Sequence, residues 1–287
     1  GILWGRFANC GQTCVAPKRV FVASEVYDRF VAAMAERVRQ LHVLGSDDTN
    51  NDPTSPQHDV TDDMYDMYDM YDMGALIRES QRESLAALRD DALQRGGKIH
   101  GGDGNAAIAN VALGGNRFSP TLLLDLPANA RALHEETFGP LLPIIRVSDE
   151  SAMIAMANDS EFGLSASVWT RDRARGRAIA KRLDAGTVVI NDVALIAGVA
   201  EVPHGGVKQS GTGRAHGTAG LEECVRTKTI VDDIFSSWRQ PWWFGYGTRA
   251  LERMDGYVRL SHGGTVRQRL SGIASTIALV FRPERPL

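Results

Sequence analysis

The chain has 287 residues, of which 43% are hydrophobic and 23% are charged, and this balance is typical of a globular protein with one large domain or two modest ones. The net charge of −3 argues against a nucleic-acid-binding protein, and no run of about 18 apolar residues predicts a membrane-spanning helix. Only three cysteines are present, too few for a disulfide framework, so we expect a cytoplasmic protein.

Strand-like and helix-like segments alternate along the chain. KRVFVA (18–23) is β-branched and aromatic and predicts a strand, after which Ser24 is expected to cap a helix. Apolar residues of that helix recur at three- and four-residue steps on one face: Tyr27, Phe30, Val31, Met34, Val38 and Leu41. Further helices are expected at 83–95, 150–158 and 173–183, and further strands at 120–124, 142–147, 165–170 and 187–191. This alternation predicts an α/β fold, with a mainly parallel sheet flanked by helices.

A tandem repeat, DDMYDMYDMYDM (62–73), interrupts this regularity. Its aspartates are of the type that binds calcium, but a three-residue step drifts around a helix and the segment lacks the glycine turn of a calcium loop. We therefore expect an insertion on the protein surface, with no metal bound.

Two of the three cysteines lie four residues apart in FANCGQTCVAPKR (7–19). A zinc site would need further Cys or His ligands at a suitable spacing, and a redox pair usually has two intervening residues where this pair has three. A free cysteine is most often a small buried hydrophobe, so packing is the default interpretation. The alternative is a nucleophile, which needs partial exposure, and the small residues Gly11 and Thr13 leave room for a substrate beside Cys14.

Four motifs make a family resemblance specific. NCGQTCVAPKRVFV (9–22) resembles the active-site cysteine motif of the aldehyde dehydrogenase superfamily, in which Gly-Gln-x-Cys precedes a strand carrying an Arg. EETFGP (135–140), FGLSASVWTRD (162–172) and PHGGVKQSGTGRAHGTAGLEECVRTKTIV (203–231) follow in the family's order. The resemblance covers 1–231 and implies the C-terminal half of the family fold, which is its catalytic domain.

By this resemblance, Cys14 is the nucleophile that attacks an aldehyde carbonyl, and its own backbone N–H holds part of the developing oxyanion. Glu136 matches the glutamate that bonds the nicotinamide ribose, and Phe138 matches the aromatic residue beside the nicotinamide. A carboxylate suits a ribose because it accepts from two adjacent hydroxyls. The resemblance thus implies an oxidoreductase that converts an aldehyde to a carboxylic acid through a thiohemiacetal and a thioester, with NAD or NADP as cofactor and no metal.

Other candidate residues are expected to be structural. Cys10 and Cys224 have no role in the family chemistry and are expected to pack. His204 stands where the family commonly has Phe, and we expect it to pack in a loop rather than act as a base. GGVKQSGTGR (205–214) is glycine-rich but does not join a strand to a helix, so we expect a crossing loop beneath the active site instead of a phosphate loop.

Three family features have no counterpart in these residues: the N-terminal dinucleotide-binding domain, the upstream Glu that activates water, and the upstream Asn that completes the oxyanion hole. Residue 1 is Gly rather than Met, so we expect a fragment that is inactive alone. The alternative hypothesis is a truncated, non-catalytic family member that serves as an oligomerisation or membrane- or partner-docking module. A thiol hydrolase that pairs Cys14 with a histidine would leave EETFGP and the SGTGR loop unexplained.

The C-terminal extension, 232–287, is rich in Trp and Arg and is expected to form an amphipathic helical tail. One apolar stripe at helical spacing comprises Val266, Leu270, Ile273, Ile277 and Val280. With arginines beside this stripe, a peripheral membrane contact is expected as one alternative and docking on a partner as the other. VALIAGVAEV (193–202) borders the substrate entrance by resemblance and favours an apolar aldehyde. Homo-oligomer formation is a further expectation.

Overall fold

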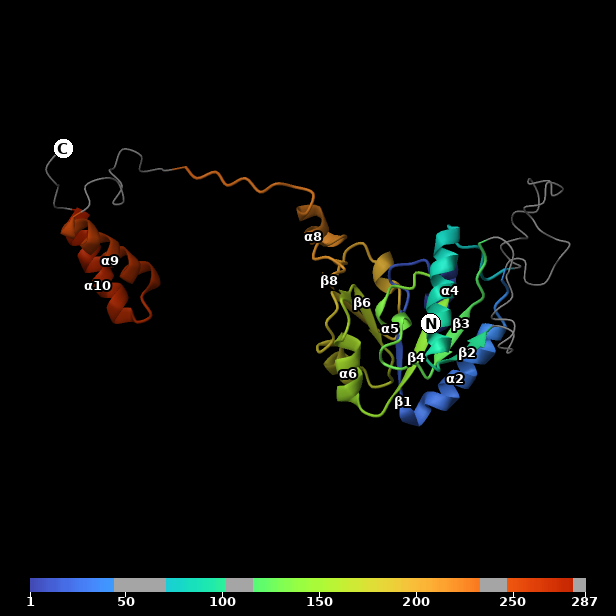
Figure 1. The fold of residues 1–287 in the computed structure, drawn as a ribbon. Coiled ribbons are helices and arrows are strands. Elements are labelled where there is room, and N and C mark those ends of the chain that lie inside the picture. Colours follow the sequence, from blue (N-terminus) through green and yellow to red (C-terminus); the bar gives the residue numbers. More distant parts are fainter. Residues whose placement is uncertain (44–70, 102–115, 233–246, 281–287) are drawn as a thin grey trace. The chain divides into compact units, whose positions relative to one another are not determined.

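The computed structural model describes residues 1–43, 71–101, 116–232 and 247–280 (Figure 1). The chain divides into two units, Gly1–Arg226 and Thr227–Leu287. The first unit holds the α/β fold, and the second is helical where it is regular. The domain boundary at 231/232 remains a prediction from the sequence.

The first unit alternates between helices and strands, as expected. In chain order its elements are α1 (Ile2–Phe7), η1 (Ala8–Gly11), β1 (Val20–Ala23), α2 (Ser24–Arg39), α4 (Glu79–Gln94), β2 (Lys98–Gly101), β3 (Thr121–Leu124), α5 (Arg131–His134), β4 (Leu141–Val147), α6 (Glu150–Asn158), β5 (Phe162–Gly163), β6 (Ser165–Val168), α7 (Arg173–Ala180), β7 (Thr187–Ile190), η3 (Leu195–Gly198), β8 (Val207–Lys208) and α8 (Gly217–Glu222). Every helix and strand expected in this unit is present, with ends that differ by a few residues.

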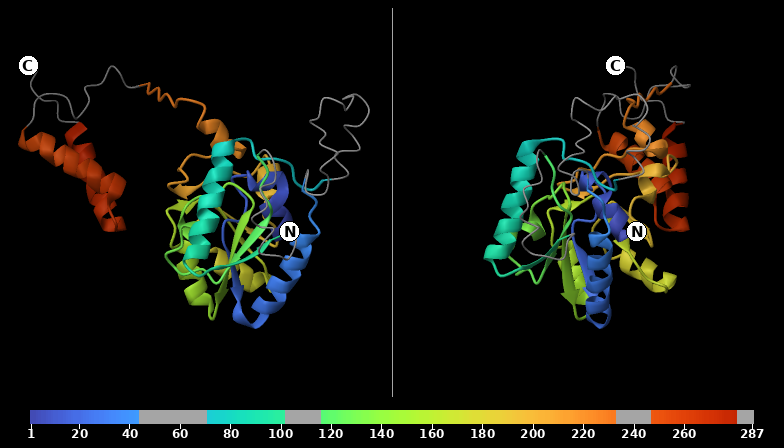
Figure 2. Two further views of the ribbon diagram at one scale, coloured as in Figure 1. Left: turned by 45° about the vertical axis from the view of Figure 1, so that its right-hand side comes forward. Right: turned by 90° about the vertical axis from the view of Figure 1, so that its right-hand side faces the viewer.

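The main sheet has four strands in the order β1-β4-β3-β2. β4 runs parallel to both β1 and β3, and β2 runs antiparallel at one edge. α2 and α4 lie on opposite sides of this sheet (Figure 2). β6 and β7 form a separate parallel pair, and β5 pairs with β8 in antiparallel fashion. Three of the five pairings between described strands are therefore parallel, which confirms the mainly parallel α/β fold, although the strands are divided among three sheets.

The largest core surrounds β3 and the first half of β4. All four residues of β3 are buried, as are the first four of β4, a continuous apolar run that is typical of strands covered on both faces. From α2 the buried residues are Tyr27, Met34 and Val38, and from α4 they are Leu85, Leu88 and Ala92. The apolar face predicted for α2 is thus confirmed, because Phe30, Val31 and Leu41 also pack against this core.

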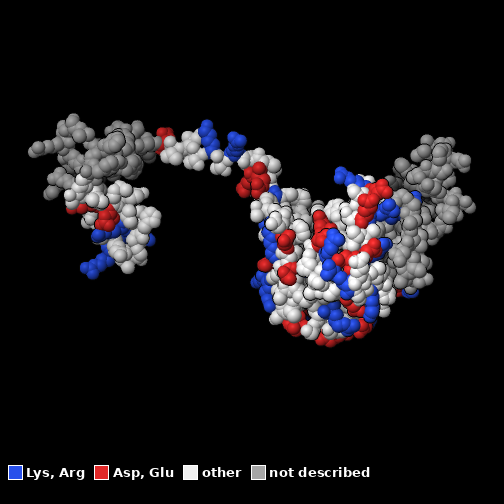
Figure 3. All heavy atoms as spheres, viewed as in Figure 1, with Lys and Arg blue, Asp and Glu red and all other residues white. Residues whose placement is uncertain are grey.

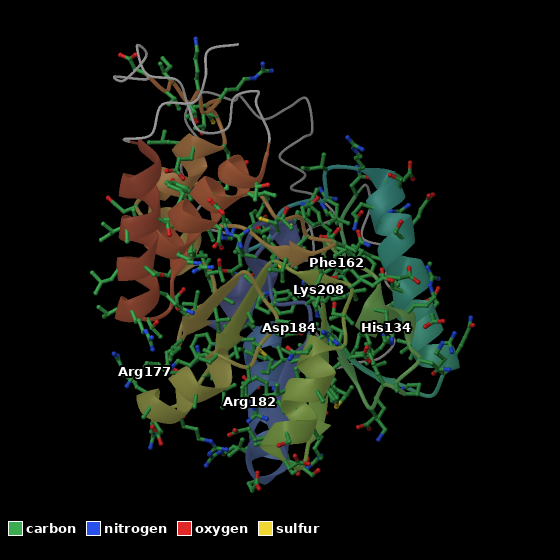
Figure 4. The ribbon with its side chains drawn as sticks, turned by 90° about the vertical axis from the view of Figure 1, so that its left-hand side faces the viewer. His134, Phe162, Arg177, Arg182, Asp184 and Lys208 are labelled. Carbon is green, nitrogen blue, oxygen red and sulfur yellow. The ribbon has the colours of Figure 1, made fainter. Side chains whose placement is uncertain are left out.

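A smaller core joins α6, β6 and α7 through Ile154, Val168 and Ile179. Beneath it, β8 crosses to β5, where Phe162 lies opposite Lys208. The Lys208 ammonium donates to the carbonyl of Asn158 at 2.7 Å and lies 3.7 Å from the Asp184 carboxylate, and Figure 4 shows these side chains close together. The glycine-rich segment after His204 therefore contains a short strand, β8, that is held to β5, and its role as a crossing loop beneath the active site stays a prediction.

Two expectations about particular residues are wrong. Ser24 does not cap α2: it is the first residue of the helix, and its hydroxyl donates to the carbonyl of Val147 at 2.9 Å on the neighbouring strand. Met73, at the end of the tandem repeat, is only 2% exposed, because its backbone N–H bonds to His42 and its side chain enters the main core. The rest of the repeat, 62–70, lies outside the described residues.

The second unit contains α9 (Thr248–His262) and α10 (Val266–Val280), which pack against each other. They approach closely at Gly272, where an added Cβ would lie 2.6 Å from the backbone oxygen of Gly256. Large apolar side chains remain exposed on both helices: Leu251, Met254, Tyr257 and Val258 on α9, and Val266, Leu270 and Ile273 on α10. In the described part of the chain, no helix is both long enough and apolar enough to cross a membrane.

Candidate active site

Cys14 follows a tight left-handed turn. The φ angles of Asn9, Cys10 and Gly11 are 50°, 55° and 69°, a region that suits Gly and Asn but strains Cys. The carbonyl of Asn9 accepts from the backbone N–H of Gln12 at 3.0 Å and from its side-chain amide at 3.3 Å. The side-chain oxygen of Gln12 also accepts from Ile77 N at 3.0 Å. Gly11 and Gln12 of the motif therefore fix the left-handed turn at 9–11, and with it the direction of the chain before Cys14.

The three cysteines have different surroundings. Cys14 is exposed, and its backbone N–H donates no hydrogen bond to the described residues, so it is free to meet an oxyanion. Cys10 is 3% exposed in the main core, as expected, and burial raises the pKa of its thiol. Cys224 is exposed, so the expectation that it packs is wrong for the described residues around it.

The 135–139 loop, between α5 and β4, alternates between inward and outward residues. Thr137 is 1% exposed and Gly139 is buried, whereas Glu136 and Phe138 are exposed. Phe138 has a φ of 40°, a strained conformation for a bulky residue that the surrounding contacts must hold. The first glutamate, Glu135, is paired with Arg131 on α5 at 2.6 Å, while Glu136 has no hydrogen-bond partner among the described residues.

Cys14, Glu136 and Phe138 line one cavity of about 750 Å³. The structure thus brings together residues separated by more than 120 positions in the chain, as the motifs led us to expect. The same cavity is also lined by residues of β1 and β6 and by Gln209 and Ser210 of the crossing loop. Nucleophile, free carboxylate and aromatic ring therefore share one space that a small molecule can enter.

Arg6, on α1, lies beneath this site and is 2% exposed. Its guanidinium donates to the carbonyl of Pro17 at 3.1 Å, to the hydroxyl of Thr137 at 2.8 Å and to the carbonyl of Gly139. Burial lowers the pKa of Arg6 to about 10, and the negative charge of Glu136 acts in the opposite direction. Arg6 is therefore a cation at neutral pH. Its two terminal nitrogens donate to oxygen atoms of two separate segments, whereas its buried Nε has no hydrogen-bond partner among the described residues.

Lys18 is a second basic residue at the site wall. Its ammonium donates to the carbonyl of Ala132 at 3.0 Å and to the carbonyl of Glu135. Burial, together with the nearby charges of Arg6 and Arg19, lowers the pKa of Lys18 to about 7, against the opposing effect of Glu136 and Glu135. Arg19 points elsewhere, since its guanidinium donates to three carbonyls at the end of α6: Met156, Ala157 and Asp159.

The residues present suit the nicotinamide end of a dinucleotide. Glu136 offers an unpaired carboxylate that can accept from two ribose hydroxyls, and the exposed ring of Phe138 offers an apolar edge at the same cavity. In the described part of the chain, no three metal-ligating side chains lie together.

The sequence reasoning missed Arg6, Lys18 and Gln81, whose amide donates to the carbonyl of Thr137 at 2.7 Å. The signal for Arg6 was a lone charge in the apolar run ILWGRF, which should have indicated a buried and paired cation. Lys18 and Gln81 carried no signal, because their partners are backbone carbonyls far away in the chain.

Comparison with known proteins gives a consistent result. The family model described as aldehyde dehydrogenase family matches residues 1–230. Succinate-semialdehyde dehydrogenase [NADP(+)] of Escherichia coli (strain K12) is 38% identical over 228 residues, 79% of this chain and 42% of that protein. A 4,4'-diapolycopene aldehyde oxidase of Methylomonas sp is 33% identical over 261 residues, 91% of this chain and 44% of that protein. The second match therefore extends beyond residue 230, into the C-terminal extension.

Solved structures agree with this comparison. Betaine aldehyde dehydrogenase from Staphylococcus aureus, solved in complex with NAD+, is 29% identical to this chain, with a TM-score of 0.61 over 77% of this chain and 40% of that protein. The chain thus spans less than half the length of the relatives it matches.

Proposed function

Since the chain belongs to the aldehyde dehydrogenase family, we propose that its protein oxidises an aldehyde to a carboxylic acid with NAD+ or NADP+, through a covalent intermediate on Cys14. The observation that carries this proposal is the single cavity lined by an exposed Cys14, a free Glu136 and an exposed Phe138. Glu136 binds the nicotinamide ribose, and Phe138 packs beside the nicotinamide.

Cys14 acts on the aldehyde as a thiolate. A bond forms between Sγ and the carbonyl carbon, and the carbonyl π electrons move to the oxygen, where the backbone N–H of Cys14 donates to the developing oxyanion. NAD+ or NADP+, when bound, supplies the acceptor for the hydride of the aldehyde carbon. Loss of that hydride leaves a thioester on Cys14, which water cleaves to the acid and the free thiol.

Turnover needs a base for this water. By resemblance, the family takes that base from a glutamate upstream of the cysteine motif, in the half of the fold that these residues do not cover. We expect the 287-residue chain alone to be acylated once on Cys14 and to turn over slowly at best.

An apolar aldehyde is the proposed substrate class. Val193 lines the cavity, and the 193–202 segment to which it belongs is almost wholly apolar. The name of the relative from Methylomonas gives a 4,4'-diapolycopene aldehyde as its substrate, and this relative also matches part of the C-terminal extension. The Escherichia coli relative, whose named substrate is the charged succinate semialdehyde, is the more identical of the two, at 38% against 33%. The apolar residues near Val193 therefore carry this proposal, and overall identity does not.

Two experiments test the proposed reaction. The first is acylation of the chain by an activated ester, followed by mass spectrometry, where the adduct is expected on Cys14 and is expected to vanish in Cys14→Ala. The second is steady-state oxidation by a protein in which the chain is joined to the complementary half of the family fold, measured as NADH or NADPH formation. Turnover that survives Cys14→Ala in that protein would overturn the proposal.

A second function is proposed for the C-terminal unit, because both of its helices expose apolar side chains away from their mutual contact at Gly256 and Gly272. Residues 227–287 hold nine Lys and Arg against five Asp and Glu, in a chain whose net charge is −3. On the visible face of the first unit, by contrast, both signs of charge are interspersed (Figure 3). We propose that this unit lies on an anionic membrane surface of the cytoplasm, with docking between copies of the chain as the alternative.

Sedimentation with vesicles separates these alternatives. The intact chain is expected to sediment with phosphatidylserine-containing vesicles and much less with phosphatidylcholine alone, because basic residues attract anionic lipid. A chain that ends at Val231 and the double variant Leu251→Ser, Leu270→Ser should both lose this binding. Ala274→Ser, an exposed change away from the stripe, is the control. Equal sedimentation of the intact and shortened chains would remove the membrane proposal, and a concentration-dependent oligomer would favour docking.

A further inference from the structure

Two basic side chains, Arg6 and Lys18, hold the 135–139 loop to the segment that carries Cys14. Lys18 donates to the carbonyl of Glu135, directly before Glu136. Arg6 donates to the hydroxyl of Thr137 and to the carbonyl of Gly139, on either side of Phe138. Glu136 therefore lies between the contact made by Lys18 and the first contact made by Arg6, and Phe138 lies between the two contacts made by Arg6.

Both basic side chains also belong to the nucleophile side of the site. Lys18 lies four residues after Cys14, and Arg6 donates to the carbonyl of Pro17 in the same segment at 3.1 Å. Their acceptors on the 135–139 loop are two backbone carbonyls and one hydroxyl, with no carboxylate among them. Contacts of this kind fix the position of the backbone itself, and hydrogen bonds from charged donors are stronger than those between neutral groups.

We infer that Arg6 and Lys18 are positioning residues that set the location of Glu136 and Phe138 relative to the Cys14 thiol. The strained φ of 40° at Phe138 fits this role, because such a conformation persists only where neighbouring contacts impose it. Gln81 adds a neutral contact from α4, to the carbonyls of Thr137 and Phe138 at 2.7 and 3.2 Å. The inference rests on the proposed function only in assigning Glu136 and Phe138 to the cofactor.

Arg19 provides a matched control within the same strand segment. It is a half-buried cation next to Lys18, and it also donates only to backbone carbonyls, but these belong to the end of α6 rather than to the 135–139 loop. Loss of Arg19 therefore removes a comparable set of hydrogen bonds, none of which reaches the 135–139 loop, and its one link to the loop is the charge that helps to lower the pKa of Lys18.

The test is hydrogen–deuterium exchange of the 287-residue chain, read by mass spectrometry in peptides that cover 135–141. Arg6→Lys keeps the positive charge but replaces the guanidinium, whose two terminal nitrogens donate to Pro17 on one side and to Thr137 and Gly139 on the other. Lys18→Met removes the amino group that donates to Glu135. Each variant is expected to speed exchange in these peptides by about tenfold or more, the factor expected when a hydrogen bond from a charged donor is lost. Arg19→Met should instead speed exchange near 150–159. Lys18→Arg should restore slow exchange at 135–141, because a guanidinium can donate to the same two carbonyls.

Two results would overturn the inference: unchanged exchange at 135–141 in both Arg6→Lys and Lys18→Met, or an equal increase along the whole first unit. If Arg6→Lys does not fold, the Lys18→Met and Lys18→Arg pair decides alone. In the protein joined to the complementary half, Arg6→Lys should raise KM for NAD(P)+ by about tenfold and leave KM for the aldehyde within about twofold. Absence of any oxidation there would refute the proposed function but leave the exchange result valid.

Discussion

Replacement of Gly11 by Ala tests how the site is assembled, because this glycine has both a positive φ angle and backbone atoms too close for a Cβ. Its φ is +69°, and an added Cβ would lie 2.6 Å from the carbonyl oxygen of Gly139 and 2.7 Å from that of Arg6. Both oxygens belong to the backbone, so neither can swing aside as a side-chain end could. The left-handed turn at 9–11 and the 135–139 loop must therefore move apart. Two other glycines separate these effects. Gly96 has a φ of +88° but no atom within 4 Å of an added Cβ, and Gly74 has neither a positive φ nor an atom within 4 Å of an added Cβ.

The three substitutions predict an ordered series. Gly74→Ala should change the free energy of unfolding by less than about 1 kcal/mol, in the stabilising direction, because it restricts only the unfolded chain. Gly96→Ala should lose about 1 kcal/mol, since an L residue in the left-handed region costs about 1–2 kcal/mol and part of this is offset in the unfolded state. Gly11→Ala adds the overlap with two backbone oxygens, at about 1–3 kcal/mol, for a total loss of about 2–4 kcal/mol.

Urea unfolding followed by far-UV circular dichroism measures the three differences, with equal m-values as the check that the same transition is compared. A loss in Gly11→Ala no larger than that in Gly96→Ala would refute the close approach of the Cys14 turn to the 135–139 loop. Exchange in the 135–141 peptides should also increase in Gly11→Ala and stay unchanged in Gly96→Ala.

Three further outcomes are expected. Limiting iodoacetamide should alkylate Cys14 well before Cys10 in the folded chain, because Cys10 is 3% exposed and burial raises the pKa of its thiol; earlier labelling of Cys10 would contradict the nucleophile assignment. Lys18 has a folded pKa of about 7 against an ordinary 10.5, so below pH 7 the folded state bears the full penalty of the buried charge, which is relieved as pH rises from 7 towards 10. The difference in stability between the unmodified chain and Lys18→Met should therefore shift in favour of the unmodified chain over that range, and a flat difference would argue against the lowered pKa. Asp149→Ala should destabilise the protein by about 1 kcal/mol, since this carboxylate caps α6 by accepting from Ala152 N at 2.9 Å, whereas Asp149→Asn should retain most of the stability.

The sequence by itself determined the order and type of most elements in the first unit. The reason is that a short apolar run and an apolar step of three or four residues are local patterns, visible in the sequence alone. The run predicts a buried strand such as β3, and the step predicts the buried face of a helix such as α2. It also identified Cys14, Glu136 and Phe138, which line one cavity, because the motifs that contain them can be recognised in the sequence without knowledge of the fold. Cys10 was correctly assigned to packing, but Ser24, Cys224 and Met73 were assigned wrongly, since capping and burial depend on neighbours that a local pattern does not contain.

Only the tertiary structure decided how the site is held. Arg6 and Lys18 donate to acceptors on the 135–139 loop, more than 110 positions away. Those acceptors are mostly backbone carbonyls, which every residue carries, so no residue type in the sequence indicates them. The left-handed turn at 9–11 is similar, because Cys10 adopts a positive φ that its residue type disfavours and that the contacts of Gln12 and the core impose. Local patterns depend on the types of neighbouring side chains, which the sequence gives directly. The placement of Glu136 and Phe138 near Cys14 depends instead on long-range contacts, most of them to backbone atoms, which the sequence does not reveal.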